Sequence, residues 1–318
     1  MPDIGAPPAD AQVELVPPPP GQVSPTEREF SVVERSQWQQ AGRRFVRHRV
    51  AMASLVVFIL LILFAWVGPH LWQFSYTHIP KGTQDNNVGP SLRHPFGTDN
   101  LGIDGLAQVM RGTQQSLKIA LTIAALAVII GSIWGVVSGY FLGVVDTILM
   151  RLADLVLTVP ALALAAALAH NTKGGWFTIA LVLGSLSTPY VARVVRGVVL
   201  SLREREFVEA ARALGASNTR IMFRHLIPNT LAVIIVNATL LIAAGILSET
   251  ALSYLGFGVR APDTSLGLLV SGAQGAVDTR PWLFYFPGIF IILIALTVNF
   301  IGDGLRDALD PRQTRQRR

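Results

Sequence analysis

The chain alternates long apolar stretches with polar connections. Five stretches contain no Asp, Glu, Lys or Arg, and each approaches the roughly 20 residues that a helix needs to cross a bilayer core. They are residues 50–67, 119–142, 176–192, 231–247 and 283–301. A sixth stretch, 155–169, is shorter, and it is long enough to span if Arg151 and Asp154 lie at its interfacial end. The pattern predicts an all-α polytopic membrane protein with six transmembrane helices.

Composition and charge give the orientation. The 318 residues are 51% hydrophobic and 14% charged, with a mean hydropathy of +0.47, whereas soluble domains carry nearer a quarter charged residues. If the N-terminus is inside, 19 of the 26 Lys and Arg residues fall on inner segments, so we expect both termini in the cytoplasm. The basic residues flank the spans without any groove-reading motif, and we therefore expect no nucleic-acid partner.

The apolar stretches divide the chain into parts. Residues 1–45 are rich in Pro and polar residues and predict a disordered cytoplasmic tail, with a proline-rich recognition site as the alternative. Residues 46–112 hold the first span and a long external loop, 113–305 hold the other spans, and 306–318 form a basic cytoplasmic tail. No cleavage site follows the first apolar run, so we expect a retained anchor. The chain has no Cys and hence no disulfides or thiol ligands.

The polar connection at 193–229 has the most informative local pattern. Phe207, Ala210, Ala211 and Leu214 recur at the spacing of one helix face. This face is small and apolar, so a partner could approach it closely. The pattern predicts a short amphipathic helix on the membrane surface.

The residues after this helix predict a corner. Gly215 suits the left-handed conformation that ends a helix, and Ser217 can cap a second helix. Pro228 is expected to reset the chain before the next apolar span. The connection therefore predicts a helix, a tight corner and a second helix.

This connection resembles the coupling loop, or EAA motif, of bacterial ABC importer permeases. The match is E-A-A-x-x-x-G at residues 209–215, followed by I-x-x-x-H-L-I-P at 221–228. In that family the short helix docks in a groove of a cytoplasmic ATPase and carries its motion to the membrane; a plain connector is the alternative. The resemblance implies these ATPase-coupling residues: Phe207, Glu209, Ala210, Ala211, Leu214, Gly215, His225 and Pro228.

The first external connection carries a second signature at residues 94–102, H-P-F-G-T-D-N-L-G. Thr98 or Asp99 is expected to cap the helix that follows. The string resembles the H-P-[FL]-G-T-D-x-x-G signature of the oligopeptide and dipeptide permease subfamily, of the OppC/DppC type. That subfamily usually continues with Arg-Asp, whereas this chain has Ile103-Asp104. Together with later matches the resemblance covers about residues 50–312, and it implies the type I ABC importer permease fold with a permease core at 113–305.

The resemblance also implies an assembly in the bacterial plasma (inner) membrane. Its other members would be a paralogous OppB/DppB-like permease, two cytoplasmic ABC ATPases and an extracytoplasmic peptide-binding protein. The chain has no G-x-x-x-x-G-K-[ST] loop and no paired histidine spacing for a metal. We therefore expect no enzymatic activity, metal or cofactor on this chain, with ATP and Mg on the partner ATPases.

The implied function is the membrane-spanning subunit of an ATP-driven di- or oligopeptide importer. Nickel, opines or antimicrobial peptides remain open as alternative cargoes of the same architecture. A secondary transporter would need an ion-linked charge within its spans, and an intramembrane enzyme would need a catalytic pair there. The candidate spans contain neither.

Four glycines recur every four residues in the second span: Gly131, Gly135, Gly139 and Gly143. Such a stripe lets another helix backbone approach closely. We expect tight packing within this subunit, and packing against a companion permease is the alternative.

Three polar residues in or beside the spans are candidates for the pathway or a gate. Asn237 and Asn299 lie mid-span, where they should face protein or a water-filled path. Glu249 follows the fifth span, where it could gate the pathway or contact a delivery protein. The alternatives are helix–helix hydrogen bonds for the asparagines and a simple interfacial carboxylate for Glu249.

Overall fold

The computed structural model describes residues 37–170 and 175–309, and within these ranges the regular structure is entirely helical. The described residues from Ala41 onward form one compact unit, and Gln37–Gln40 belong to a second unit. Helix α1 comprises Gln37–Arg47. The predicted tails at 1–45 and 306–318 fall largely outside the described residues.

In the part of the chain that the structure describes, five helices are long and apolar enough to cross a membrane. Each holds all or nearly all of one of the five charge-free stretches. A helix satisfies its backbone hydrogen bonds internally, as a bilayer core requires. The five helices are α2 (Arg49–Trp66), α4 (Gly105–Phe141), α7 (Trp176–Leu202), α10 (Ile227–Tyr254) and α12 (Trp282–Leu309).

The third predicted span is broken. Helices α5 (Gly143–Thr158) and α6 (Ala161–His170) meet at an angle of 85°, so the stretch at 155–169 straddles a bend. Pro160 stands at the break, and Val159 before it is extended, with φ −82° and ψ 135°, because a proline disfavours the helical conformation of the preceding residue. The third span is therefore bent at Pro160, and the described residues hold six candidate spans if the bent pair counts as one.

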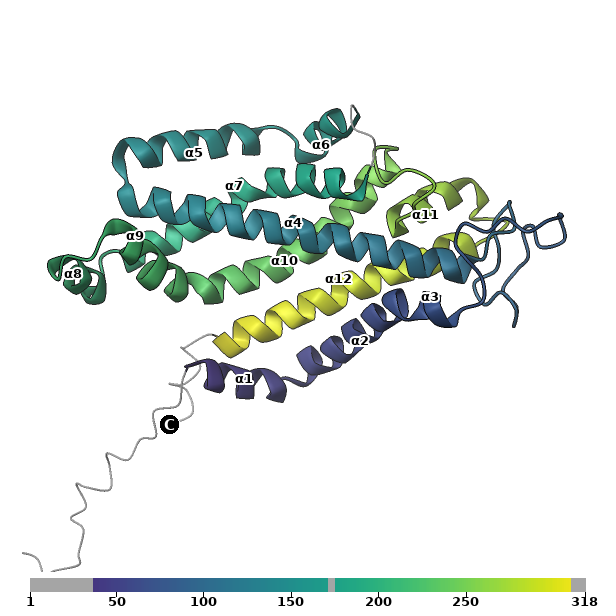
Figure 1. Cartoon of the computed structure of the whole chain (residues 1–318), viewed down its shortest axis with the longest axis horizontal. Coiled ribbons are helices and arrows are strands. Elements are labelled where there is room, and N and C mark those ends of the chain that lie inside the picture. The colour runs from purple at the N-terminus through teal and green to yellow at the C-terminus, as the bar shows by residue number, and fades with distance from the viewer. Residues whose placement is uncertain (1–36, 171–174, 310–318) are drawn as a thin grey trace, which may run out of the picture. The chain divides into compact units, whose positions relative to one another are not determined.

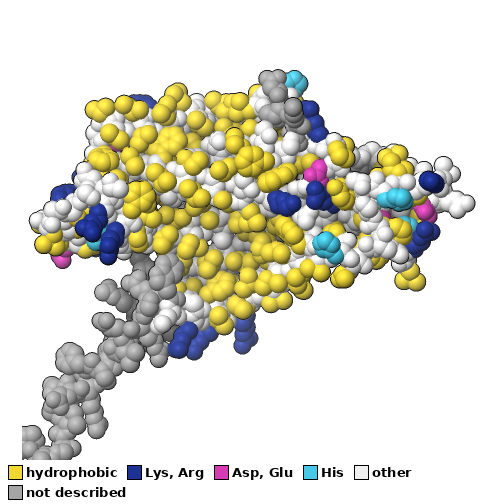
Figure 2. Space-filling view, in the orientation of Figure 1, with side chains coloured by type: hydrophobic (Ala, Val, Ile, Leu, Met, Phe, Trp, Pro, Cys, Tyr) yellow, Lys and Arg dark blue, Asp and Glu magenta, His cyan; other side chains and the backbone are white. Residues whose placement is uncertain are grey.

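The long helices pack side by side in an order that differs from their order in the chain. Helix α4 lies along α7 on one side and contacts α10 on another; α12 packs on α10, and α2 packs on α12 (Figure 1). In Figure 2, hydrophobic side chains cover most of the middle of the face, while Lys and Arg gather mainly toward its ends. This distribution is typical of a helical bundle in a bilayer.

The glycine stripe lies at the α4–α7 contact. A Cβ on Gly131 would be 2.7 Å from Val191 Cβ, and one on Gly135 would overlap the carbonyl oxygen of Ala192. Gly139 is similarly crowded by Val199 of α7. The fourth glycine departs from the prediction. Gly143 has φ +58°, and a Cβ added there would meet nothing within 4 Å, because α4 ends at Phe141 and Gly143 starts α5 at the corner.

The bundle has two distinct ends (Figure 1). We call one the α8 end, because it carries α8 (Glu206–Ala213) and α9 (Asn218–Ile221). We call the other the α11 end, because it carries α11 (Leu266–Ala273), α3 (Gly68–Leu71) and the loop at 72–104.

Candidate functional site

The connection between α7 and α10 forms the candidate site, and we call residues 203–228 the coupling segment. Helix α8 ends at Ala213, and Gly215 follows with φ +79°. The Ser217 hydroxyl then accepts a hydrogen bond from the N–H of Arg220 at 3.3 Å and caps α9. The predicted path of helix, left-handed corner and helix is confirmed.

Pro228 does not reset the chain as predicted. Helix α9 continues through a π-helical turn, η2 (Met222–Leu226), into α10, so Asn218–Tyr254 is one continuous helix. Pro228 lies in the first turn of α10. The N–H that proline lacks therefore falls at the junction between two hydrogen-bonding patterns, where its absence is tolerated.

One face of the coupling segment is fixed to the bundle. Val208, Ile221 and Leu226 are fully buried in a cluster that includes Val136 of α4 and Val199 of α7. Side chains packed at this density have little freedom to shift independently. Val208 of α8 therefore shares one buried core with the ends of α4 and α7.

A polar attachment lies next to this cluster, at the end of α4. The Tyr140 hydroxyl donates a hydrogen bond to Asn218 Oδ1 at 2.8 Å. Arg203 Nη1 donates to the carbonyl oxygen of Tyr140 at 3.4 Å, and the Arg212 guanidinium lies 6.0 Å from the centre of the tyrosine ring. Tyr140 is thus held by three parts of the coupling segment, a role that the sequence did not indicate.

The opposite face of α8 is exposed and partly apolar. Phe207 is 39% exposed and Leu214 is 88% exposed, and Glu209 and Ala210 lie beside them on the surface. Ala211 differs from the prediction because it turns inward, three residues after Val208, and packs on the buried cluster. The outward apolar face is therefore Phe207, Ala210 and Leu214.

His225 completes the surroundings of this face. Its ring centre lies 6.5 Å from that of Phe207, so η2 and α8 meet at these two side chains. Lys and Arg side chains gather around the α8 end (Figure 2). Exposed apolar side chains within a basic rim are typical of a protein-binding surface.

The three polar candidates for the pathway lie apart from this segment and share no hydrogen bond among the contacts described. Asn237 is 9% exposed, and its side-chain amide donates to the carbonyl oxygen of Val233 on the same helix at 2.8 Å. Asn299 is half-buried on α12. Glu249 has no exposed surface in this conformation.

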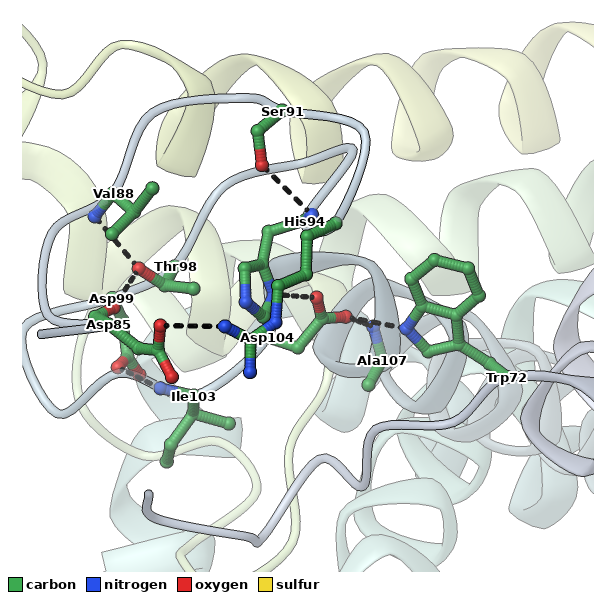
Figure 3. Close-up of polar contacts among 11 residues, drawn as sticks. Trp72, Asp85, Val88, Ser91, His94, Thr98, Asp99, Ile103, Asp104 and Ala107 are labelled. Atoms are coloured by element: carbon green, nitrogen blue, oxygen red, sulfur yellow. Dashed lines mark hydrogen bonds and ion pairs between the residues drawn. The ribbon is translucent and has the colours of Figure 1, made fainter. Parts of the chain in front are cut away.

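The loop at the α11 end is organised around Asp104 (Figure 3). Its Oδ1 accepts hydrogen bonds from the N–H of Ala107 at 2.8 Å and from the indole of Trp72 at 3.0 Å. Its Oδ2 lies 2.8 Å from Nδ1 of the buried His94. Asp104 therefore caps α4 and ties two distant parts of the loop to it.

The prediction that Thr98 or Asp99 caps this helix is wrong, because α4 begins only at Gly105. Both residues fold the loop instead. Thr98 accepts a hydrogen bond from the N–H of Val88, and Asp99 accepts from the N–H of Ile103, each at 2.9 Å. The position of Asp104 directly before a helical run was the signal for the true cap.

Residues 127–315 match the family described as binding-protein-dependent transport system inner membrane component. The chain belongs to this family. Residues 36–91 also match the N-terminal TM domain of oligopeptide transport permease C. The family and the apolar helices together make the chain a multi-pass protein of the inner membrane.

Curated relatives of this inner membrane component cover nearly the whole chain. The oligopeptide transport system permease protein OppC of Mycobacterium tuberculosis H37Rv is 42% identical, over 87% of this chain and 95% of its own. The OppC protein of Escherichia coli K12 is 39% identical, over 89% and 94%. The dipeptide transport system permease protein DppC of Alkalihalophilus pseudofirmus is 36% identical, over 91% and 93%.

A solved structure supports the predicted fold. The MetNI methionine ABC transporter, in an inward facing conformation, matches with a TM-score of 0.54 over 64% of this chain and 96% of that chain. At 18% identity this similarity concerns the fold alone. The type I ABC importer permease fold is confirmed.

Proposed function

We propose that this chain is the permease subunit of an ATP-driven importer of di- or oligopeptides, and that α8 couples it to the ATPases. Relatives named as oligopeptide and dipeptide permeases, at 36–42% identity, support the cargo class. The observation that carries the coupling role is the two-sided construction of α8. Val208 is fully buried on the bundle side, whereas Leu214 is 88% exposed on the other.

The coupling follows from this construction. A partner ATPase binds the outward face of Phe207, Ala210 and Leu214, with Glu209, Gly215, His225 and Pro228 shaping the surface around it. When the ATPase pair closes on ATP, it pulls α8. Because the inward face packs on α4 and α7, the pull tilts these spans and changes which side of the membrane the pathway opens to.

The positions of the other subunits follow from the proposed orientation, with both termini in the cytoplasm. The α8 end, with most of the Arg residues, faces the cytoplasm and the two ATPases, which hold ATP and Mg. The α11 end faces the extracytoplasmic peptide-binding protein. A paralogous OppB/DppB-like permease supplies the other half of the pathway, in which Asn237 and Asn299 are candidate lining residues.

A substitution on the exposed face tests the coupling. Leu214→Glu places a charge on the proposed ATPase contact without touching the bundle core. We expect the chain to insert normally, while the ATPases no longer co-purify and peptide uptake falls at least about tenfold, as for a residue central to an interface. Thr219→Glu, which is also exposed and lies on α9, is the matched control and should keep both. Normal ATPase recovery with Leu214→Glu would overturn the coupling role.

The cargo needs a separate measurement. Vesicles with the full complex and its binding protein should accumulate labelled di- or oligopeptides in an ATP-dependent manner, and should not accumulate nickel. Nickel accumulation without peptide uptake would keep the permease assignment and replace the cargo.

A further inference from the structure

Glu249 is a buried carboxylate near the end of α10, at the α11 end of the bundle. Its side chain has no exposed surface, and a lone buried charge would be very costly there. Three serine hydroxyls from three parts of the chain donate to it. Ser253 and Ser265 donate to Oε1, each at 2.7 Å, and Ser116 of α4 donates to Oε2 at 3.2 Å.

Two of these serines also bind the first turn of α11. The N–H of Leu266 donates to the Ser116 hydroxyl at 3.1 Å, and the N–H of Leu268 donates to the Ser265 hydroxyl at 3.2 Å. A hydroxyl that accepts from an amide remains free to donate its own proton. Ser116 and Ser265 therefore each bridge a backbone N–H of α11 and the Glu249 carboxylate. These N–H groups lie in the first turn of α11 and would otherwise have no partner within the helix.

The backbones around this network are in close contact. A Cβ on Gly267 would lie 2.6 Å from Thr250 Cα, and one on Gly112 of α4 would lie 3.1 Å from the nitrogen of Leu266. A Cβ on Gly258 would overlap the Ser253 hydroxyl. Helices α4, α10 and α11 thus meet here without room for larger side chains, an observation independent of the hydrogen bonds.

A second set of contacts covers the network from the surface side. The Arg111 guanidinium of α4 binds both carboxylate oxygens of Asp263, at 2.8 and 3.1 Å. The Gln115 side-chain amide donates to the same carboxylate. The segment that leads into α11 is therefore attached to α4 twice, once at the surface and once in the interior.

We propose that Glu249 is a positioning residue, whose carboxylate holds α11 against α4 and α10 through the Ser116 and Ser265 hydroxyls. We call Glu249, the three serines and the first turn of α11 the Glu249 joint. The joint makes α11 move together with α4 and α10. The expected effect of the joint on transport rests on the proposed function. The placement of α11 by the joint does not depend on that function.

Moving the carboxyl group within the joint tests this role. Ser265 is the N-cap residue of α11, and Asp is as good a cap as Ser. In the double variant Glu249→Gln/Ser265→Asp, the carboxylate stands directly at the helix N-terminus, and the glutamine amide introduced on α10 can donate to it. Ser265→Asp alone brings two buried carboxylates together, and Glu249→Gln alone leaves the serines without their common acceptor.

The placement of α11 can be measured without transport. The chain has no Cys, so spin labels can be attached at Leu101→Cys and Gln274→Cys, two exposed positions. Leu101 is held near the start of α4, since its N–H donates to Asp99, whose carboxylate also binds Gln108 of that helix. Gln274 directly follows α11. The distance between the labels, in the full transporter in lipid nanodiscs, reports whether α11 keeps its place on α4.

We expect a single narrow distance for the wild type, and broad or shifted distances for each single variant. Peptide uptake should fall about tenfold in each, the factor that corresponds to losing a buried hydrogen bond to a charged group. The double variant should restore the narrow distance and bring uptake to within about threefold of wild type. The amide on α10 and the carboxylate at position 265 can hydrogen-bond again, and the effects of sites in contact do not simply add. Asp303→Asn, which removes an exposed carboxylate of α12 outside the joint and outside the α11 end, is the matched control and should change neither the distance nor the uptake.

A folded double variant that is no better than the single variants would overturn the proposal. If the larger Asp side chain prevents insertion, a double-mutant cycle that only removes groups can test the joint instead. The combination of Ser116→Ala with Glu249→Gln should reduce peptide uptake no more than the more severe of the two single variants. A loss equal to the product of the two single losses would contradict the joint. Restored distances in the double variant, together with no peptide uptake even by the wild-type complex, would uphold the joint and reject the proposed cargo.

Discussion

The coupling segment and the Glu249 joint both attach short helices to α4, at opposite ends of the bundle, but they are built in opposite ways. The coupling segment buries apolar side chains on one face and leaves Phe207 and Leu214 exposed on the other. The joint exposes nothing of Glu249 and satisfies its carboxylate with three hydroxyls. An exposed apolar surface is suited to binding a partner, whereas a buried polar network whose hydrogen bonds are satisfied fixes helices within the subunit.

This difference predicts how substitutions will divide. Changes on the coupling segment should alter the interaction with ATPases more than the stability of the chain. Changes in the joint should do the reverse. The contrast between the two regions would be weaker if any of the following substitutions changed both transport and the stability of the chain to the same extent.

The largest effect on transport is expected from Gly215→Pro. The proline ring fixes φ near −65°, whereas this corner needs φ +79°, and the hydrogen bond from the Gly215 N–H to the carbonyl of Arg212 is lost. With a backbone penalty of roughly 3 kcal/mol or more confined to an exposed corner, uptake should be abolished while membrane insertion remains. Gly215→Asn is the control, since asparagine tolerates this conformation and the site has open space. Wild-type uptake by the proline variant would refute the coupling assignment.

An intermediate effect, on stability, is expected from Gly258→Ala. The added methyl group would overlap the Ser253 hydroxyl and lie 2.5 Å from Ser253 Cα. Overpacking of this kind costs about 1–3 kcal/mol, which should lower the thermal unfolding midpoint of the purified chain. Gly272→Ala on α11 meets nothing within 4 Å and should leave the midpoint unchanged. Equal midpoints for the two variants would mean that the joint is looser than its contacts indicate.

The smallest effect is expected from Tyr140→Phe, which removes only the hydrogen bond to Asn218. Such a bond contributes about 1 kcal/mol, and the ring would remain in place. We expect normal stability and a modest rise in the ATP hydrolysed per peptide imported, because the coupling segment would have one contact fewer with α4. Tyr190→Phe, at an exposed tyrosine of α7, is the control. An unchanged ratio would show that the apolar cluster alone carries the connection.

The sequence allowed local features to be predicted far better than long-range ones. Gly215 and Ser217 determine their corner through their own conformational and capping preferences, so it could be recognised without a structure. The charge-free stretches likewise predicted the long helices, since length and composition decide whether a helix can span. A proline beside a span end indicates a kink at Pro160, but the 85° angle of the bend does not follow from the proline alone.

The partners of Glu249 could not be predicted, because they come from distant positions. Ser116 lies 133 residues before it in the chain, and only the packing of α4 on α10 brings the two together. Tyr140 and Asn218 are similarly separated, by 78 residues. Hydroxyls and aromatic rings are common in helices, so nothing in their spacing distinguishes a long-range partner from a neighbour.

The π-helical turn at Met222–Leu226 has a consequence for how this protein can vary. A π turn holds one more residue than an α-helical turn, and one residue corresponds to a rotation of about 100° around a helix axis. Deleting a single residue there would convert the turn to α-helix and rotate everything before it relative to the membrane span. The turn therefore sets the direction in which the docking face points, independently of the lipid-facing pattern of α10. Under the proposed coupling role, an insertion or deletion at this one place would re-orient α8 relative to its ATPase without changing the membrane span.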